Sequence, residues 1–179
     1  MKDSSRKNCF LTFSLIVLGI VFGILSKSGD VAIQGNIWGD MLRAFGYITS
    51  DFFIWVVICT RIAILSKTKF LSVINILVFL IAMLLTYYLY SYFIVGYLVL
   101  RVVKFWLIML LPSAVLGCII WNIKTSRILK YIMIIAGTFI MIIDIISQGL
   151  LPIAMIIYAI LYAVFLITLL SKPKYFDKP

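Results

Sequence analysis

The chain has 179 residues, 65% of them hydrophobic, and a mean hydropathy of +1.21. This composition excludes a soluble domain with a polar surface and indicates an integral membrane protein. The formal net charge is +10, but the cations lie in clusters between apolar runs. This pattern is typical of charges that set the orientation of membrane helices, so we expect no nucleic-acid partner.

Long apolar runs predict transmembrane α-helices along the chain. A helix rises about 1.5 Å per residue, so about 20 apolar residues cross a hydrocarbon core about 30 Å thick. The runs are continuous rather than alternating, which favours helices over a transmembrane barrel. We predict an all-α fold in which residues 1–179 form a single membrane domain of six helices. The predicted spans cover about residues 9–25, 44–65, 70–90, 102–121, 128–147 and 153–170.

The first predicted span, residues 9–25, follows the basic segment MKDSSRKN. A basic start before an apolar run is also typical of a signal peptide, but no small-residue cleavage site follows, so we expect a retained helix. Gly19 and Gly23 lie four residues apart in this span. Small residues at this spacing let helix backbones approach closely, so we predict that both glycines pack against another helix of the same chain.

The second predicted span, residues 44–65, contains an aspartate, Asp51, and an arginine, Arg61. Asp51 lies seven residues inside the predicted boundary, which corresponds to a depth of about 10 Å. A charge at the membrane centre costs about 2.5–3.5 kcal/mol even on insertion scales, so this carboxylate needs a partner or a water-filled cavity. Arg61 lies near the inner boundary, and we expect its side chain to extend to the interface.

The third and fourth predicted spans meet in a tyrosine-rich stretch, LLTYYLYSYFIVGYLVLRVVKFW. Tyrosine and tryptophan concentrate at the headgroup level of a bilayer, so this stretch is typical of an outer aromatic belt. It also offers cations and hydroxyl groups that could compensate Asp51, and the fifth span adds a second carboxylate near its outer end. We therefore predict an outward-facing ligand-binding cluster of Asp51, Asp144, Arg101, Lys104, Tyr87, Tyr88 and Tyr90.

Two structural interpretations of Asp51 stay open beside this ligand site. The carboxylate could form an interhelical salt bridge that only holds the helices together. Alternatively, the helix boundary could lie closer to Asp51, whose side chain would then contact water. Each interpretation explains the aspartate without a ligand.

Lysines and arginines are distributed unequally between the two sides of the six predicted spans. Twelve lie on the side of the two termini and four on the other side. Because positive residues concentrate on the cytoplasmic side of membrane proteins, we predict that both termini are cytoplasmic. The three cysteines then lie toward the reduced side, which agrees with the lack of a CxxC spacing among them.

The sequence has no histidine and no glutamate, which removes the commonest general base and the usual metal-binding motifs. It contains no GxSxG, Walker A or dinucleotide-binding motif either. Catalysis by aspartate, tyrosine or lysine stays open, but we expect a non-enzymatic protein with neither a metal nor a cofactor.

The stretch SDFFIWVVICTRIAILSKT, followed by NILVFLIAMLLTYYLY and a tryptophan-bearing span, resembles an uncharacterised family of small multi-pass membrane proteins from Gram-positive bacteria. The resemblance covers the second to fourth predicted spans. It implies a location in the bacterial plasma membrane and carries no known activity.

Two functions from different classes follow from these features. The first is a subunit that binds or transports a small solute or a lipid headgroup at the predicted outer cluster. Six helices in 179 residues are similar in size to the substrate-binding subunits of energy-coupling-factor vitamin transporters. The second is a non-enzymatic accessory or immunity protein that interacts with another membrane protein in the lipid bilayer.

Overall fold

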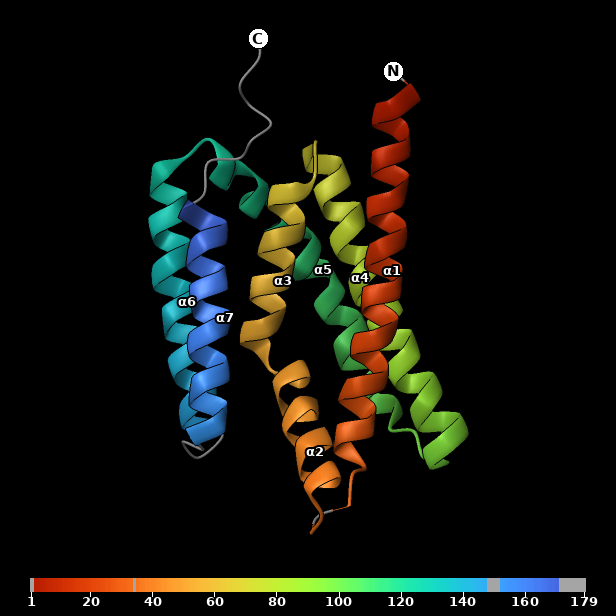
Figure 1. The fold of residues 1–179 in the computed structure, drawn as a ribbon. Helices are drawn as coiled ribbons and strands as arrows, with labels where there is room; N and C mark the ends of the chain where they lie inside the picture. Colours follow the sequence, from red (N-terminus) through yellow and green to blue (C-terminus); the bar gives the residue numbers. More distant parts are fainter. Residues whose placement is uncertain (1, 34, 148–151, 171–179) are drawn as a thin grey trace. The chain divides into compact units, whose positions relative to one another are not determined.

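The computed structural model describes residues 2–33, 35–147 and 152–170. Within these ranges every regular element is a helix and no strand occurs, so the all-α prediction is confirmed (Figure 1). The main helices are α1 (Lys2–Asp30), α2 (Ile37–Ser50), α3 (Phe52–Leu65), α4 (Lys69–Tyr90), α5 (Leu100–Trp121), α6 (Arg127–Ser147) and α7 (Pro152–Leu170). A short π-helix, Ser91–Val95, extends α4, and a 3₁₀-helix, Asn122–Lys124, follows α5.

Several helices have the length and composition of membrane spans. In the described part of the chain, four segments are long and apolar enough to cross a membrane: Phe10–Asp30, Lys69–Val95, Leu100–Lys124 and Arg127–Ser147. Helices α2 and α3 give a fifth span if the chain crosses the membrane through both of them. The described apolar part of α7, Met155–Leu170, is shorter. The structure is thus compatible with a membrane protein of four or five spans, whereas six spans and the side of the termini stay predictions.

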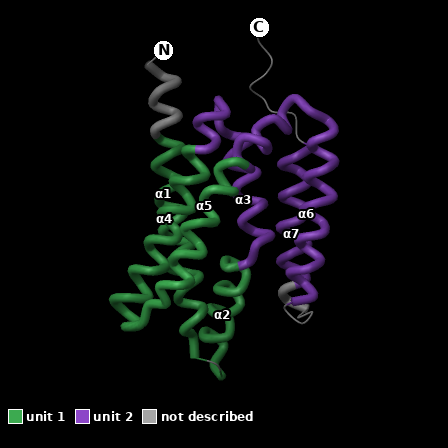
Figure 2. Tube along the Cα trace, turned by 180° about the vertical axis from the view of Figure 1, so that it is seen from behind, with its two compact units in different colours: residues 1–50, 74–115 green, residues 51–73, 116–179 purple. Residues whose placement is uncertain are grey.

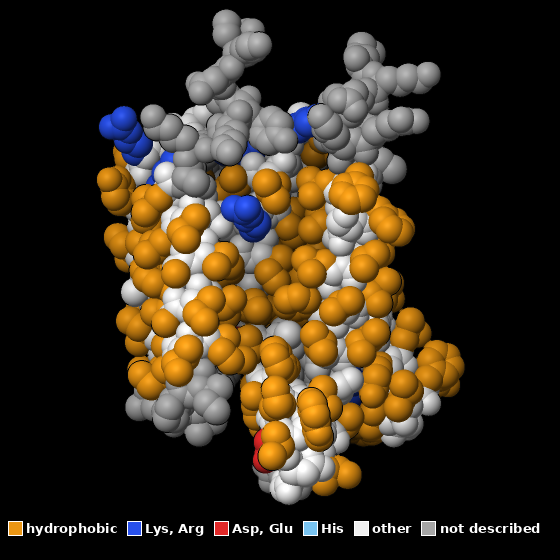
Figure 3. Space-filling view, viewed as in Figure 1, with side chains coloured by type: hydrophobic (Ala, Val, Ile, Leu, Met, Phe, Trp, Pro, Cys, Tyr) orange, Lys and Arg blue, Asp and Glu red, His pale blue; other side chains and the backbone are white. Residues whose placement is uncertain are grey.

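The surface of the helices is largely apolar. Hydrophobic side chains cover most of the face shown in Figure 3. Large apolar residues with more than half of their area exposed include Phe13, Leu111, Ile135 and Ile156. Water would solvate such a surface poorly, whereas lipid chains cover it without cost.

The chain forms two compact units (Figure 2). The first comprises residues 1–50 and 74–115, and the second comprises residues 51–73 and 116–179. Helices α4 and α5 each contribute one part to either unit. The prediction of a single domain over the whole chain stays a prediction.

In the first unit, glycines bring α1 close to its neighbours. A Cβ atom built on Gly19 or on Gly23 would lie 2.5 Å from a backbone carbonyl oxygen of α4. Real Cβ atoms essentially never come this close to another atom, so these positions admit only glycine without a shift of the helices. The backbones of Gly29 and Gly46 meet in the same way between α1 and α2. Close backbone approach through small residues is the usual way in which helices pack in a membrane.

In the second unit, α3, α6 and α7 pack around an aromatic core. Phe53 is 0% exposed, and its ring centroid lies 6.2, 6.4 and 5.9 Å from those of Tyr158, Tyr162 and Phe165. Gly137 of α6 leaves room for the Phe165 ring, since a Cβ atom at this glycine would lie 2.5 Å from ring carbon Cε1. The aromatic side chains of α7 therefore occupy the space between the other two helices.

The predicted second span, residues 44–65, is two helices rather than one. Helix α2 ends at Ser50 and α3 begins at Phe52, with Asp51 between them in an extended conformation, φ −72° and ψ 148°. Short polar side chains such as aspartate favour helix starts over helix interiors, which accounts for a break at this residue. The break places a carboxylate at the beginning of a new helix.

Candidate functional site

The first turn of α3 is capped by a carboxylate from a different helix. Asp51 is the N-cap residue of α3, but its side chain makes no capping hydrogen bond. Instead, the backbone N–H of Phe53 donates to Oδ2 of Asp144, in α6, over 2.8 Å. The carboxylate of Asp51 accepts a hydrogen bond from the hydroxyl of Tyr158, in α7. We call Asp51, Asp144 and Tyr158 the α3 entry site.

Helix geometry explains why a carboxylate is stable at this position. The first four N–H groups of a helix have no acceptor within the helix. The N-terminus also carries a partial positive charge, so a carboxylate beside it is stabilised by about 0.3–1 kcal/mol. Both aspartates are half-buried, while Phe53 and Tyr158 are 0% and 1% exposed. The α3 entry site therefore places two acidic groups beside buried aromatic side chains.

Further hydroxyl groups lie along α7 beyond the α3 entry site. Tyr162, one helical turn after Tyr158, forms a hydrogen bond of 2.7 Å with the hydroxyl of Thr138 in α6. The guanidinium group of Arg61, in α3, donates to the hydroxyl of Thr168 over 3.4 Å. A spacing of four residues places both tyrosines on one face of α7, and both rings lie beside Phe53. Along its length, α7 thus makes polar contacts with Asp51, with α6 and with α3.

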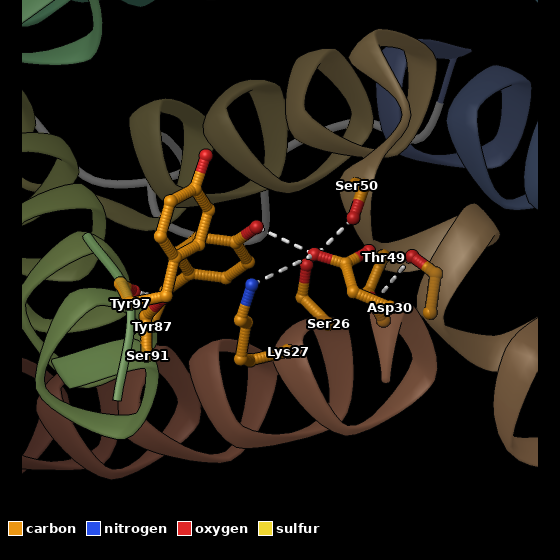
Figure 4. A network of polar contacts seen from close by, with 9 residues as sticks. Ser26, Lys27, Asp30, Thr49, Ser50, Tyr87, Ser91 and Tyr97 are labelled. Carbon is orange, nitrogen blue, oxygen red and sulfur yellow. Dashed lines mark hydrogen bonds and ion pairs between the residues drawn. The ribbon is translucent and has the colours of Figure 1, made fainter. Parts of the chain in front are cut away.

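The first unit holds a different polar cluster, between α1 and α4. The hydroxyl of Tyr87 donates to Oδ2 of Asp30 over 2.5 Å, and the ammonium group of Lys27 lies 3.7 Å from the same oxygen. The lysine also lies 4.9 Å from the centroid of the Tyr87 ring. Figure 4 shows Lys27 and Tyr87 directed toward Asp30. We call these three residues the α1–α4 cluster.

Serine hydroxyls join α1 to the end of α2 in the same region. The hydroxyl groups of Ser26 and Ser50 lie 2.6 Å apart (Figure 4). Thr49 donates to the carbonyl oxygen of Phe45 within α2, over 2.8 Å. In contrast, the hydroxyl of Tyr88 is buried and has no hydrogen-bond partner among the described residues. Among the buried side-chain oxygens and nitrogens described in the first unit, this phenol is the one without a partner.

The residues of the predicted outer cluster fall in two different units. Asp51 and Asp144 belong to the second unit, where both lie at the first turn of α3. The other five belong to the first unit. That these five residues lie close to the two aspartates stays a prediction.

Within the first unit, these five residues have different surroundings. Tyr87 contacts Asp30, while the hydroxyl of Tyr88 is unpaired among the described residues. Tyr90 is half-buried in the last turn of α4. Arg101 and Lys104 are exposed at the start of α5, and neither forms an ion pair with a described residue.

Lys27, Asp30 and Tyr158, which belong to the α1–α4 cluster and the α3 entry site, were not among the residues predicted from the sequence. Two signals could have indicated them. Lys27 and Asp30 have opposite charges three residues apart, a spacing that pairs side chains on a helix. Tyr158 and Tyr162 lie one turn apart in an otherwise apolar run, where a tyrosine needs a hydrogen-bond partner.

No group of three or more histidine, cysteine or acidic residues that could hold a metal ion occurs among the described residues. No protein-family model matches the chain, and no curated protein or solved structure is significantly similar to it.

Proposed function

We propose that this chain is a multi-pass membrane protein that binds a proton or a small cationic solute at the α3 entry site and carries it across the membrane. The observation that carries this proposal is the presence of two carboxylates, Asp51 and Asp144, at the first turn of α3, beside a buried tyrosine. The site keeps Asp51 and Asp144 of the ligand-binding cluster expected from the sequence and adds Tyr158.

The proposal includes six membrane spans with both termini in the cytoplasm. It rests on the twelve-to-four distribution of lysine and arginine between the two sides of the predicted spans. A bacterial plasma membrane is proposed from the resemblance described above. Labelling of a cysteine introduced at Thr68, between α3 and α4, by an impermeant reagent in intact cells would contradict this topology.

Charge favours a cation or a proton over an anion at the α3 entry site. Two carboxylates close to one helix end disfavour each other's charged form unless a positive group balances them. Asp144 receives a backbone N–H rather than an ammonium or guanidinium group. Arg61 is ten residues after Asp51, about 15 Å further along α3. An added cation or proton would therefore be stabilised beside Asp144.

The break between α2 and α3 supports binding at this position. Transporters often build their sites from interrupted helices, because the interruption exposes helix ends and backbone groups to a ligand. Here the interruption separates α2 from α3. Together these two helices are long and apolar enough to form one membrane span. The hydroxyls of Tyr158 and Tyr162 provide groups that can pass a proton along α7.

Conservative substitutions separate a transport role from a purely structural one. Asp51→Asn and Asp144→Asn keep an oxygen that accepts the observed hydrogen bonds but remove the titratable charge. Asp40→Asn is the matched control, because Asp40 is exposed in the first turn of α2. Purified protein is reconstituted into liposomes that contain a pH-sensitive dye, and proton flux is driven by a potassium diffusion potential.

We expect wild-type protein and Asp40→Asn to conduct protons at the same rate and the two site variants to be at least about tenfold slower. Parallel experiments follow the uptake of sodium and guanidinium ions. Equal fluxes in all variants would overturn the role of the α3 entry site. Wild-type flux no greater than that of protein-free liposomes, for protons and for both ions, would overturn transport itself.

The exposed faces of α5 and α6 favour a second candidate, an accessory protein that binds another membrane protein. Gly117 and Ile120 are the buried residues of α5, and Gly137 is that of α6, in helices that are described over their whole length. Phe139 of α6 is 65% exposed. One membrane protein that copurifies in fixed stoichiometry with wild type, and is lost on Phe139→Ala, would support this candidate.

A further inference from the structure

The second unit has a basic end, formed by the connections between α3 and α4 and between α5 and α6. Five cationic residues lie in these connections or in the first turn of the helix that follows: Lys67, Lys69, Lys124, Arg127 and Lys130. Lys67, Lys69 and Arg127 are exposed, and the other two are half-buried. We call these five residues the basic end.

No described carboxylate of the second unit lies near the basic end. Asp51 precedes α3, a helix of 14 residues, so it is about 20 Å from the other end of that helix. Asp144 is 17 residues after Arg127 along α6, a rise of about 25 Å. Both separations exceed the screening distance of about 8 Å at physiological ionic strength. Neither of these two acids therefore lies within the screening distance of the basic end.

A tryptophan fixes the two connections to each other. The indole N–H of Trp121 donates to the carbonyl oxygen of Ser66 over 3.1 Å, and the ammonium group of Lys124 donates to the same oxygen. The ammonium groups of Lys69 and Lys124 lie 5.7 and 4.9 Å from the centroid of the indole ring. The hydroxyl of Ser72 also donates to the carbonyl oxygen of Gly117 over 3.1 Å. The ammonium group of Lys124 is thus positioned by a hydrogen bond and a ring contact before any ligand binds, and that of Lys69 lies over the same ring.

These contacts leave N–H groups of the lysines available to an anionic ligand. An ammonium group has three N–H donors, of which Lys124 directs one to Ser66. Charge that is placed in advance and only partly paired binds an anion without the cost of ordering side chains. Tryptophan beside lysine is also typical of the headgroup level of a membrane.

We propose that the basic end binds the phosphate group of an anionic phospholipid. The proposal is independent of transport at the α3 entry site, since it concerns the other end of α3. Clusters of basic residues next to membrane helices attract anionic lipids, with a contribution that corresponds to about fivefold in affinity for each lysine or arginine. A free phosphate ion has the same chemistry but lacks the acyl chains, which would contact the apolar helix surface.

The test compares lipids and matched charge variants of the full chain. Native mass spectrometry in a neutral detergent measures binding of phosphatidylglycerol, phosphatidylcholine and inorganic phosphate at equal concentrations. The site variant is Lys67→Gln/Lys69→Gln/Arg127→Gln. The control, Arg43→Gln/Arg101→Gln/Lys104→Gln, removes the same charge from exposed or half-buried positions of the first unit.

We expect wild type and the control to bind phosphatidylglycerol at least about tenfold more tightly than phosphatidylcholine. The site variant should lose about 100-fold in phosphatidylglycerol affinity, or about fivefold for each cation. Equal losses in the site variant and the control would indicate attraction to net charge alone and overturn the site. Inorganic phosphate that binds as tightly as phosphatidylglycerol would overturn the assignment to a lipid.

A single substitution tests the same proposal if the triple variant does not fold. Lys69→Gln removes an exposed ammonium group that contacts only the indole ring among the contacts described above. Its thermal unfolding midpoint should equal that of wild type, and its affinity for phosphatidylglycerol should fall about fivefold. A folded Lys69→Gln variant with unchanged affinity would contradict the proposal.

Discussion

Each unit holds an aspartate that accepts a hydrogen bond from a tyrosine, but the two carboxylates have different surroundings. In the first unit, Asp30 accepts from Tyr87 and also lies 3.7 Å from the ammonium group of Lys27. In the second unit, Asp51 accepts from its tyrosine, and a further carboxylate, that of Asp144, lies at the same helix start.

The partner of each carboxylate, rather than the acidic residue itself, separates a structural contact from a candidate site. A carboxylate beside an ammonium group is neutralised within the protein, and the α1–α4 cluster needs no ligand to balance it. At the first turn of α3, the carboxylate of Asp144 receives a backbone N–H instead of an ammonium or guanidinium group, so a proton or a cation can balance its charge. Substitutions in both units test whether the two carboxylates differ in this way.

The largest effect is expected where the first unit depends on close backbone contact. Gly19→Leu/Gly23→Leu inserts side chains where a Cβ atom would already lie 2.5 Å from α4 carbonyl oxygens. Overpacking of this kind should cost about 1–3 kcal/mol at each residue, and two such residues on one face of α1 should cost more than either alone. The folded yield in detergent should collapse, and the α1–α4 cluster should separate. Val21→Leu, at an exposed position of α1, is the control. A double variant as stable as wild type would contradict this packing.

A smaller effect is expected from the cap of α3. Asp144→Ala leaves the N–H of Phe53 without its acceptor and should lower the free energy of unfolding by about 1–2 kcal/mol. Asp144→Asn keeps an oxygen at this position and should lower it by less. Thermal unfolding of both variants in the same detergent measures the difference. Equal stability of Asp144→Ala and wild type would show that the cap contributes nothing.

The α1–α4 cluster should contribute about 1 kcal/mol of stability without affecting transport. Tyr87→Phe and Asp30→Asn each remove part of the contact between Tyr87 and Asp30. In a double-mutant cycle the two losses should be less than additive, because both remove the same hydrogen bond. Proton flux in liposomes should equal that of wild type. A tenfold loss of flux in Asp30→Asn would place transport in the first unit instead.

The smallest effect is expected from the neighbouring tyrosine. The hydroxyl of Tyr88 is buried without a partner among the described residues, so Tyr88→Phe removes a polar group that gains nothing from folding. Its unfolding midpoint should stay equal to that of wild type or rise slightly. Tyr87→Phe, one residue away, should lower it. The opposite order would show that Tyr88 has a partner that matters to the fold.

Sequence patterns predicted the all-α fold, because continuous apolar runs form helices in a membrane, but they did not predict the break between α2 and α3. The aspartate at residue 51 was also conspicuous, since a charge in such a run needs compensation. Its contact with Tyr158 was not predictable. The two residues are 107 positions apart, and only the packing of α3 against α7 brings them together.

The extent of the first helix shows a different limit of sequence patterns. The predicted span ended at residue 25, because Ser26, Lys27 and Asp30 are polar. The structure continues α1 to Asp30, where these side chains contact Ser50 and Tyr87. Hydropathy detects where the apolar run ends, whereas the helix continues for as long as its polar side chains find partners on other helices.

The cap on α3 has a consequence for the order of synthesis. Phe53 and Asp144 are separated by 91 residues, so a ribosome that adds about 5–20 residues per second makes the donor about 5–18 s before its acceptor. During that interval the first turn of α3 lacks its carboxylate. The start of this helix therefore reaches its final state only after α6 has been made, and truncation of the chain before Asp144 should leave the amide of Phe53 open to hydrogen exchange.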